Sequence, residues 1–361
     1  MQIDIKHSEY VLLTAVFWET EHDLYKRSDC MNRLRLNLRV TGCPNKCFHC
    51  HCRGGGNTKV FFDTDTIIKT ASFFRDKLNT DVSVLLLDEQ TYYPGFFELI
   101  ARLEAEGFMY NGNQKFLVTN CWGLKNVPGF IDQLNEHYYM VIPTIFGISG
   151  VHDMHVRRKG NYDEIIYSTK ECLLKGLKVM WHLQWSKLNT EDMIRLYEIG
   201  ESMGVTAINI SGEYYFSGFY PDNAEEFHPV SDDFNKIKHR IAEHELPLLK
   251  TANQIIDDIK NGILYDVKKV PFDGVYDIYI NEKFDIYPLT HHFEKYRLGN
   301  LDDPECRIIE QIQHGCFLPK AIINKRNQDF SELVLKYADT SSNKLYTPQT
   351  LFDKLCLEHV G

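Results

Sequence analysis

The stretch Leu34–Asn57, LRLNLRVTGCPNKCFHCHCRGGGN, carries four of the chain's ten cysteines within ten positions. Before the cysteines, leucine and valine alternate with polar residues, which is the period of a β-strand. After them, three consecutive glycines permit a tight loop whose backbone approaches a ligand closely. The pattern predicts a strand that ends in a loop able to wrap a bulky metal group.

Length and composition predict a folded chain of one large domain or two ordinary ones. Of its 361 residues, 43% are hydrophobic and 13% aromatic, enough for a sizeable core. No apolar run approaches the roughly 18 to 20 residues that a membrane helix needs. The N-terminus lacks the basic start and the cleavage site of a signal peptide. We therefore expect a cytoplasmic protein with no membrane partner.

The net charge and the cysteines argue against two further classes, nucleic-acid-binding proteins and disulfide-stabilised proteins. The formal net charge is −10, which argues against a nucleic-acid partner because such a protein needs a positive face. In a reducing cytoplasm, cysteines are metal ligands, catalytic groups or buried thiols rather than disulfides. Outside the cluster, the cysteines are scattered and are predicted to be inert buried thiols: Cys30, Cys121, Cys172, Cys306, Cys316 and Cys356.

From residue 33 onward, short β-branched runs alternate with segments of helical period, which is typical of βαβ units around a parallel sheet. The predicted strands span 34–40, 82–88, 115–120, 139–147, 178–185 and 206–211, and the predicted helices 64–78, 95–107, 127–137, 162–176 and 191–204. Six units predict a partial (β/α)6 TIM-type barrel, with a doubly wound open sheet as the alternative. In both folds, ligands bind beyond the C-terminal ends of the strands.

The pattern changes after the sixth strand. We expect an N-terminal extension over 1–30, the barrel over 31–225, and a smaller α+β C-terminal domain with a helical tail over 226–361. A helix is expected near 232–243 and short strands at 276–281 and 284–289.

Cys43, Cys47 and Cys50 have the spacing of ligands. Three thiolates would leave one iron of a [4Fe–4S] cluster open to a substrate. Two alternatives stay open: a structural zinc site completed by Cys52, His49 or His51, and a closed ferredoxin-like cluster completed by Cys52.

The spacing of these cysteines, with an aromatic residue at Phe48, resembles the CxxxCΦxC signature of the radical S-adenosylmethionine (radical SAM) superfamily. The resemblance implies a [4Fe–4S] cluster on Cys43, Cys47 and Cys50, with S-adenosylmethionine as the second cofactor. In that family, a Gly-Gly-Glu-Pro-like stretch after the second strand holds the methionyl amino group. Here Leu87 and Asp88 replace the glycines, and Glu89 matches the acidic position, so Asp88 or Glu89 would pair with the ammonium.

Two further segments resemble the peptide- and protein-modifying branch. FGISGVHDMHVRRKGNYDEII is similar to its SxDGxxxxHDxxR segment after strand four, matching at Ser149, His152, Asp153, one of Arg157 and Arg158, Gly160 and Tyr162. The branch has a cofactor-contacting residue at the end of strand five. His182 and Gln184 lie there, on the predicted inner face of the strand, and Asn189 is expected to open the next helix as its N-cap.

Residues 279–303 resemble the entrance to a SPASM or twitch domain. An LGN turn stands at 298–300, but Leu289 replaces the cysteine of the branch, and Cys306 and Cys316 do not restore its CxxC pairs. We therefore expect a domain of related shape without an auxiliary cluster. His291 and His292 are adjacent on an extended segment, so they point to opposite faces and are predicted to be exposed.

The resemblance implies an enzyme that cleaves S-adenosylmethionine reductively and removes a hydrogen atom from a peptide or protein side chain. A sugar or amino-acid derivative is the alternative substrate, and a zinc-stabilised binding protein is the alternative of another class. Substrate contacts are expected from Glu213, Tyr214 and Tyr215. The expected electron donor is a low-potential protein such as flavodoxin or ferredoxin.

Overall fold

The computed structural model describes residues 33–48, 50, 59–109, 116–138, 140–212, 228–239, 249–267, 275–288, 297–303, 308–310, 312 and 328–358. Within these ranges, no helix is both long enough and apolar enough to cross a membrane.

The first sheet is built around β1 (Arg33–Leu38), which pairs in parallel with β2 (Asp81–Leu86) on one side and with β8 (Val275–Ile280) on the other. The strands β9 (Asp285–Pro288) and β10 (Gly299–Asn300) follow β8 with antiparallel pairing. Strand β8 comes from the region expected to start a separate domain. Its pairing attaches that region directly to the strand that precedes the cysteine loop.

The second sheet contains β3 (Phe116–Thr119), β4 (Met140–Ile145), β5 (Lys178–Gln184) and β6 (Ala207–Ser211), all parallel and in sequence order. The expected continuous six-strand array is therefore divided between β2 and β3. The described residues near this division form one bridge, from Val84 to Met109.

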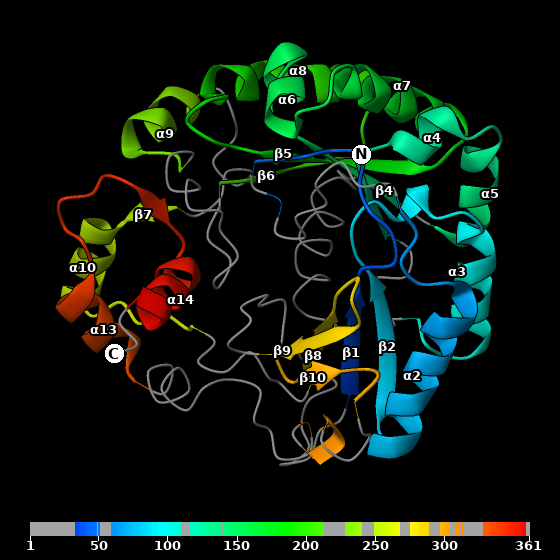
Figure 1. The fold of residues 1–361 in the computed structure, drawn as a ribbon. Helices are drawn as coiled ribbons and strands as arrows, with labels where there is room; N and C mark the ends of the chain where they lie inside the picture. The colour runs from blue at the N-terminus through cyan, green and yellow to red at the C-terminus, as the bar shows by residue number, and fades with distance from the viewer. Residues whose placement is uncertain are drawn as a thin grey trace, which may run out of the picture.

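Helices follow the strands as predicted, and every predicted barrel element matches an observed one within three residues. Figure 1 shows the helices along the outer side of a curved array, with the strands on its inner side. They are α2 (Thr64–Leu78), α3 (Phe96–Ala105), α5 (Phe130–His137), α7 (Asn161–Leu174) and α8 (Thr190–Met203). Three short elements were not expected: η1 (Gln90–Tyr92), α4 (Trp122–Asn126) and α6 (Gly150–Val156).

Helix α2 illustrates how local sequence defines an element. The Asp63 side chain caps its start by accepting a hydrogen bond from the Thr66 backbone N–H at 2.7 Å. Asn79 ends it in the left-handed conformation with φ of 48°. Between them, Ile67 and Phe74 repeat at helical spacing and are fully buried. The helix therefore packs one apolar face on the sheet.

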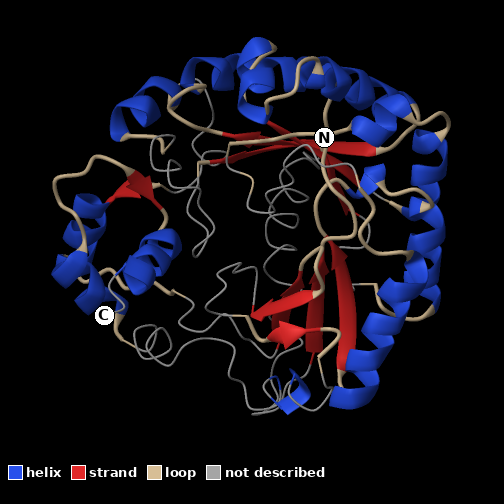
Figure 2. Cartoon of the chain, viewed as in Figure 1, coloured by secondary structure: helices blue, strands red, loops and turns tan. Residues whose placement is uncertain are grey.

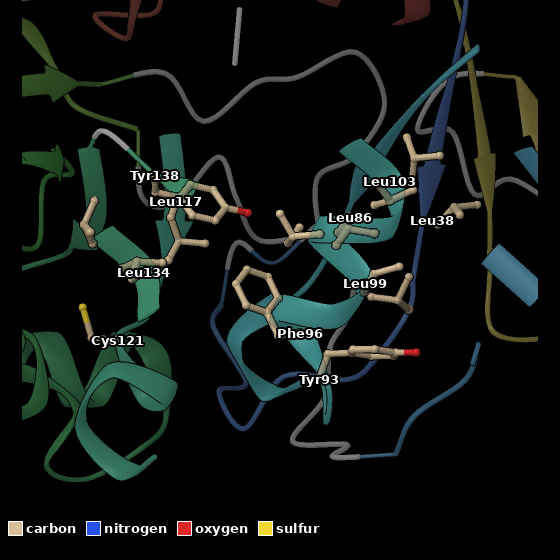
Figure 3. Packing of buried hydrophobic residues seen from close by; sticks show 14 of the residues in the cluster. Leu38, Leu86, Tyr93, Phe96, Leu99, Leu103, Leu117, Cys121, Leu134 and Tyr138 are labelled. Atoms are coloured by element: carbon tan, nitrogen blue, oxygen red, sulfur yellow. The ribbon is translucent and has the colours of Figure 1, made fainter. Parts of the chain in front are cut away.

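The core lies between the strands and this outer layer of helices. Figure 3 shows Phe96 and Leu99 of α3 close to Leu86 of β2, with Leu134 of α5 on the neighbouring side. The Phe96 ring stacks on Phe130 with centroids 5.6 Å apart. Aromatic and leucine side chains thus fill the layer between the strands and the helices.

A second, smaller core forms near the C-terminus, in the part at the left of Figure 2. It gathers α10 (Ala252–Lys260), α13 (Phe330–Tyr337) and α14 (Pro348–Glu358) beside the pair β7 (Lys250–Thr251) and β11 (Leu345–Tyr346). Helix α9 (Ser231–Ile237) precedes these elements in the sequence. The predicted boundaries at residues 30 and 225 fall outside the described residues and stay predictions.

Candidate functional site

The cysteine loop leaves β1 at its C-terminal end. A hydrogen bond of 3.0 Å from the Gly42 N–H to the Lys59 carbonyl closes the base of the loop. Cys43, Cys47 and Cys50 are half-buried and form no disulfide. A turn with a hydrogen bond of 3.2 Å from the Cys50 N–H to the Cys47 carbonyl keeps the second and third cysteines close.

The loop is anchored on the C-terminal end of α6. The Lys46 N–H donates to the Val156 carbonyl at 2.9 Å, and the Phe48 N–H donates to the His155 carbonyl at 3.1 Å. The last carbonyls of a helix have no partner within the helix, so they are available to another backbone. The segment after β4 thereby holds the cysteine loop through its main chain.

Side chains reinforce this anchor. The Asn45 amide donates to Asn161 Oδ1 at 2.8 Å, while Asn45 Oδ1 accepts a hydrogen bond from Arg158 Nε. Arg158 also forms a two-pronged ion pair with Glu164 of α7. Asn161 is fully buried and donates its own amide to the Asn120 carbonyl at 2.8 Å. The loop is therefore tied to α7 and to the end of β3.

Glu89 follows β2 and is only 3% exposed. Its carboxylate accepts hydrogen bonds from the Thr119 hydroxyl at 2.7 Å, from the Asn120 backbone N–H at 2.6 Å, and from both the hydroxyl and the N–H of Thr91. Burial raises the pKa of Glu89, while these hydrogen bonds act in the opposite direction. Glu89 is therefore a buried and fixed acceptor, not a solvated residue at a strand end.

Asp88 occupies a position where the resembled motif has glycine, and it adopts φ of 64°. Its side chain is fully buried and pairs with Arg39 Nε at 2.8 Å. Arg39 also binds Glu282, in the turn after β8, at 2.7 Å. Burial alone would lower the pKa of Arg39, but Asp88 and Glu282 raise it above its ordinary value. The ion pair fixes Asp88 in the left-handed backbone conformation that glycine would adopt more readily.

A cavity of about 170 Å³ lies where these parts meet. It touches two of the cysteines, both carboxylates after β2, the ends of β3 and β4, and the braces of the loop. Its lining comprises Cys43, Asn45, Cys47, Asp88, Glu89, Val118, Thr119, Asn120, Thr144, Phe146, Val156 and Asn161. Cys43 and Cys47 are thus brought to one cavity with both predicted acidic positions.

The donor set of this cavity fits an iron–sulfur cluster. Burial, followed by neighbouring negative groups, raises the pKa of Cys43 and of Cys47, and Cys50 contributes to both shifts. Bound iron would hold these thiols as thiolates and relieve that cost. Across the described part of the chain, no three His, Cys, Asp or Glu side chains converge on a single ion. A cubane cluster needs no such convergence, because each of its thiolates binds a different iron.

The segment after β4 uses most of its predicted residues as internal supports. Asp153 caps the start of α7 by accepting from the backbone N–H groups of Gly160 and, at 3.0 Å, Tyr162. His152 accepts from the Phe146 N–H at 3.1 Å and lies 3.2 Å from Asn161 Oδ1.

Burial lowers the pKa of His152 to about 4 and that of His155 to about 3. Both imidazoles are therefore neutral near pH 7.

The two arginines predicted as alternatives have different surroundings. Arg158 is occupied by Asn45 and Glu164, as described above. Arg157 is left-handed with φ of 53°, and its guanidinium lies 4.0 Å from the centre of the Phe48 ring. Ser149 precedes α6 with φ of 46°. Neither arginine lines the cavity described above, and Ser149 does not line it either.

The prediction that His182 and Gln184 share the inner face of β5 agrees with the structure. Leu183 and Trp185 are fully buried, and the Trp185 indole donates to Thr190 of α8 at 3.1 Å. His182 Nε2 lies 3.3 Å from Gln184 Oε1, and burial lowers the pKa of His182. His182 is in register with Thr144, which lines the cavity.

Asn189 stands at the N-cap of α8 as expected, but its side chain makes no capping bond. Its amide instead donates to the carbonyls of Phe146 and Gln184, each at 2.8 Å. It thereby joins the ends of β4 and β5.

The asparagines of the site were not predicted from the sequence. Asn45, Asn120 and Asn161 line the cavity, together with Thr119. Asn120 had a usable signal, because it directly follows a predicted strand at the edge where ligands bind. Cys121, Cys172 and Cys356 are fully buried, as predicted. Several predicted residues lie outside the described ranges: Cys30, His49, His51, Cys52, Glu213, Tyr214, Tyr215, Leu289, His291, His292, Cys306 and Cys316.

One protein family and several solved structures are similar to the chain. The Radical SAM superfamily model matches residues 38–198. No curated protein sequence matches the chain. SuiB from Streptococcus suis, bound to its precursor peptide SuiA, is similar with a TM-score of 0.54 and 14% identity, covering 99% of this chain and 83% of SuiB. The structure of anSMEcpe with AdoMet (S-adenosylmethionine) and the Cp18Cys peptide is similar with a TM-score of 0.53 and 11% identity. The match covers 91% of this chain and 96% of anSMEcpe.

These matches agree with the mixed α/β architecture and support a partial-barrel fold over nearly the full length of the chain. The family match covers the cysteine loop and the ends of β2 to β5. The cofactors of this family are a [4Fe–4S] cluster and S-adenosylmethionine, and the cavity offers a donor set suited to the cluster. The part of the chain that builds the site, residues 38–198, therefore matches the Radical SAM superfamily of enzymes.

Proposed function

We propose that Cys43, Cys47 and Cys50 hold the cluster, that the cavity beside them receives the methionyl end of S-adenosylmethionine, and that the substrate is a peptide or protein side chain. The observation that carries the cofactor assignment is the meeting of Cys43 and Cys47 with Glu89 in one cavity. When bound, the cluster and S-adenosylmethionine supply a 5′-deoxyadenosyl radical that removes a hydrogen atom from the substrate.

The protein's contribution is binding and orientation. Glu89 is the residue assigned to the methionyl ammonium, because its buried carboxylate already accepts hydrogen bonds in a fixed direction. Asp88 stays with Arg39 and shapes the backbone at the cavity wall. Between the two arginines, the contacts favour Arg157 for the cofactor, because Arg158 braces Asn45 and Glu164.

Further assignments follow from position. Phe48 lies under Arg157 at the edge of the cysteine loop. Ser149, His182 and Gln184 are assigned to the cofactor from the strand ends at which they stand. Glu213, Tyr214 and Tyr215 are assigned to the substrate, since they follow β6 in the sequence.

A peptide substrate is supported by the fold likeness to SuiB and anSMEcpe, both of which have structures with peptides. The strands β8, β9 and β10 belong to the region that we assign to a SPASM- or twitch-like domain. Since Leu289 stands at the expected cysteine position, we propose that this domain has no auxiliary cluster. The second candidate substrate is a sugar or amino-acid derivative. It is kept because an auxiliary cluster often accompanies peptide oxidation, and we propose none for this chain.

Isotope transfer tests the substrate class. The reconstituted enzyme is incubated anaerobically with S-adenosylmethionine, dithionite and either a pool of uniformly deuterated peptides or a pool of deuterated sugars and amino acids. Hydrogen abstraction from the substrate transfers deuterium to 5′-deoxyadenosine, which mass spectrometry detects. We expect deuterium from the peptide pool. Transfer from the small-molecule pool alone would establish the second candidate instead.

A further inference from the structure

Asn120 makes a side-chain contact with one of the proposed cluster ligands. Its amide Nδ2 donates a hydrogen bond to Cys43 Sγ at 3.3 Å. Asn120 lies directly after β3, 77 positions along the chain from Cys43. The contact therefore depends on the fold rather than on the cysteine loop itself.

The orientation of this amide is fixed by its other partners. Asn120 Oδ1 accepts the Trp122 backbone N–H at 2.9 Å. Because a backbone N–H can only donate, the oxygen must face Trp122 and the NH₂ group must face the sulfur. On the main chain, the Asn120 N–H binds Glu89, and its carbonyl accepts from Asn161. Three further hydrogen bonds thus hold the donor in place before any cofactor binds.

A hydrogen bond to a cysteine ligand changes the energy of an iron–sulfur cluster. The reduced cluster carries one more negative charge than the oxidised cluster, and this charge is shared with the ligand sulfurs. A fixed N–H donor therefore stabilises the reduced form more than the oxidised form, which raises the reduction potential.

We propose that Asn120 is a positioning residue that acts through Cys43 to raise the reduction potential of the cluster. The donor makes the cluster easier to reduce by the enzyme's electron donor. This inference rests on the proposed ligand role of Cys43, and it adds a residue that the sequence motif does not contain.

The test is a redox titration of the reconstituted full-length protein, monitored by the electron paramagnetic resonance signal of the reduced cluster without S-adenosylmethionine. Asn120→Leu removes the donor at similar volume, and Asn120→Ala removes it without adding bulk. Asn126→Leu is the matched control, since Asn126 is exposed at the end of α4 and its amide donates to the Trp122 carbonyl.

At a fixed solution potential, we expect the ratio of reduced to oxidised cluster to be about tenfold lower in both Asn120 variants than in the wild type, equivalent to a downward shift of about 59 mV for one electron. Asn126→Leu is expected to match the wild type. An unshifted potential in either Asn120 variant that retains the cluster overturns the inference. A wild-type protein that binds no cluster contradicts the proposed function itself, and iron analysis separates this result from the preceding one.

Discussion

At the end of β2, the side chains of Asp88 and Glu89 line the cavity, whereas the polar residues after β4 mostly bind one another and the cysteine loop. Both regions were assigned to cofactor binding from their motif positions. The segment after β4 is the closer match to the resembled pattern, yet its Asp153 and Arg158 serve as supports. A motif position can thus support the cysteine loop or a neighbouring helix without lining the cavity.

The two regions also differ in how they are held. Asp88 depends on a buried ion pair that reaches the turn after β8, which is remote in sequence. The segment after β4 is held mainly by contacts between residues close in sequence, such as those of the Asp153 carboxylate with the start of α7 and of Arg158 with Glu164. We therefore expect single substitutions that break the contacts of Asp88, at the end of β2, to lower the free energy of unfolding more than substitutions after β4.

The largest effect is expected from Arg39→Met. The variant keeps an apolar stem but leaves the buried Asp88 carboxylate without its arginine, so the free energy of unfolding should fall by about 3 to 5 kcal/mol. Urea denaturation at pH 7 measures this loss. Asp88→Gly is the control, because it removes the carboxylate and suits φ of 64°, where a side chain costs roughly 1 to 2 kcal/mol. Equal losses in both variants would show that the ion pair does not govern this region.

Acidification should lower the free energy of unfolding through the buried imidazoles after β4. The folded-state pKa of His155, about 3, lies below its ordinary value, so the unfolded chain binds a proton that the folded chain does not. This contribution to stability is complete above about pH 6.5 and decreases as the pH falls toward 3. Between pH 7 and pH 5, the loss is about 2 kcal/mol for this residue.

His155→Phe isolates that contribution. The substitution preserves a ring that can stack on Phe146, where the present centroid distance is 4.3 Å. Urea denaturation at pH 7 and at pH 5 should show a smaller acid-induced loss in the variant, by about 2 kcal/mol. The same loss in both proteins would mean that this imidazole is not held neutral by the fold.

The smallest effect is expected from Asp153→Asn. Asparagine keeps an oxygen for one of the two N–H groups at the start of α7 but loses the charge, so the cost should be about 1 kcal/mol. Thermal unfolding measures it, with Asp163→Asn as a control on the same first helical turn. A loss as large as that of Arg39→Met would remove the difference between the two regions.

Local sequence patterns predicted the barrel elements well. The alternation before Cys43 and the helical period after Asp63 are properties of neighbouring residues, and they correspond to β1 and α2. The ligand spacing is likewise local, so the cysteine loop was recognisable. By contrast, the pairing of β8 with β1 joins residues about 240 positions apart, and no local pattern encodes it.

The polar contacts of the site were the least predictable part. Asn120 and Asn161 acquire their roles from partners 31 to 116 positions away. The pairing of Asp88 with Arg39 also depends on the parallel register of β1 and β2. Such contacts depend on tertiary packing, which a single sequence does not specify residue by residue.

The central claim is that Cys43, Cys47 and Cys50 hold a cluster that cleaves S-adenosylmethionine. The most direct measurement is the amount of 5′-deoxyadenosine formed anaerobically with dithionite by the reconstituted wild type and by a variant with all three cysteines changed to alanine, together with iron and sulfide content. The account predicts about four irons and four sulfides per wild-type chain, with 5′-deoxyadenosine formed by the wild type alone. A protein that holds zinc instead, or a triple variant that keeps both cluster and activity, would contradict it.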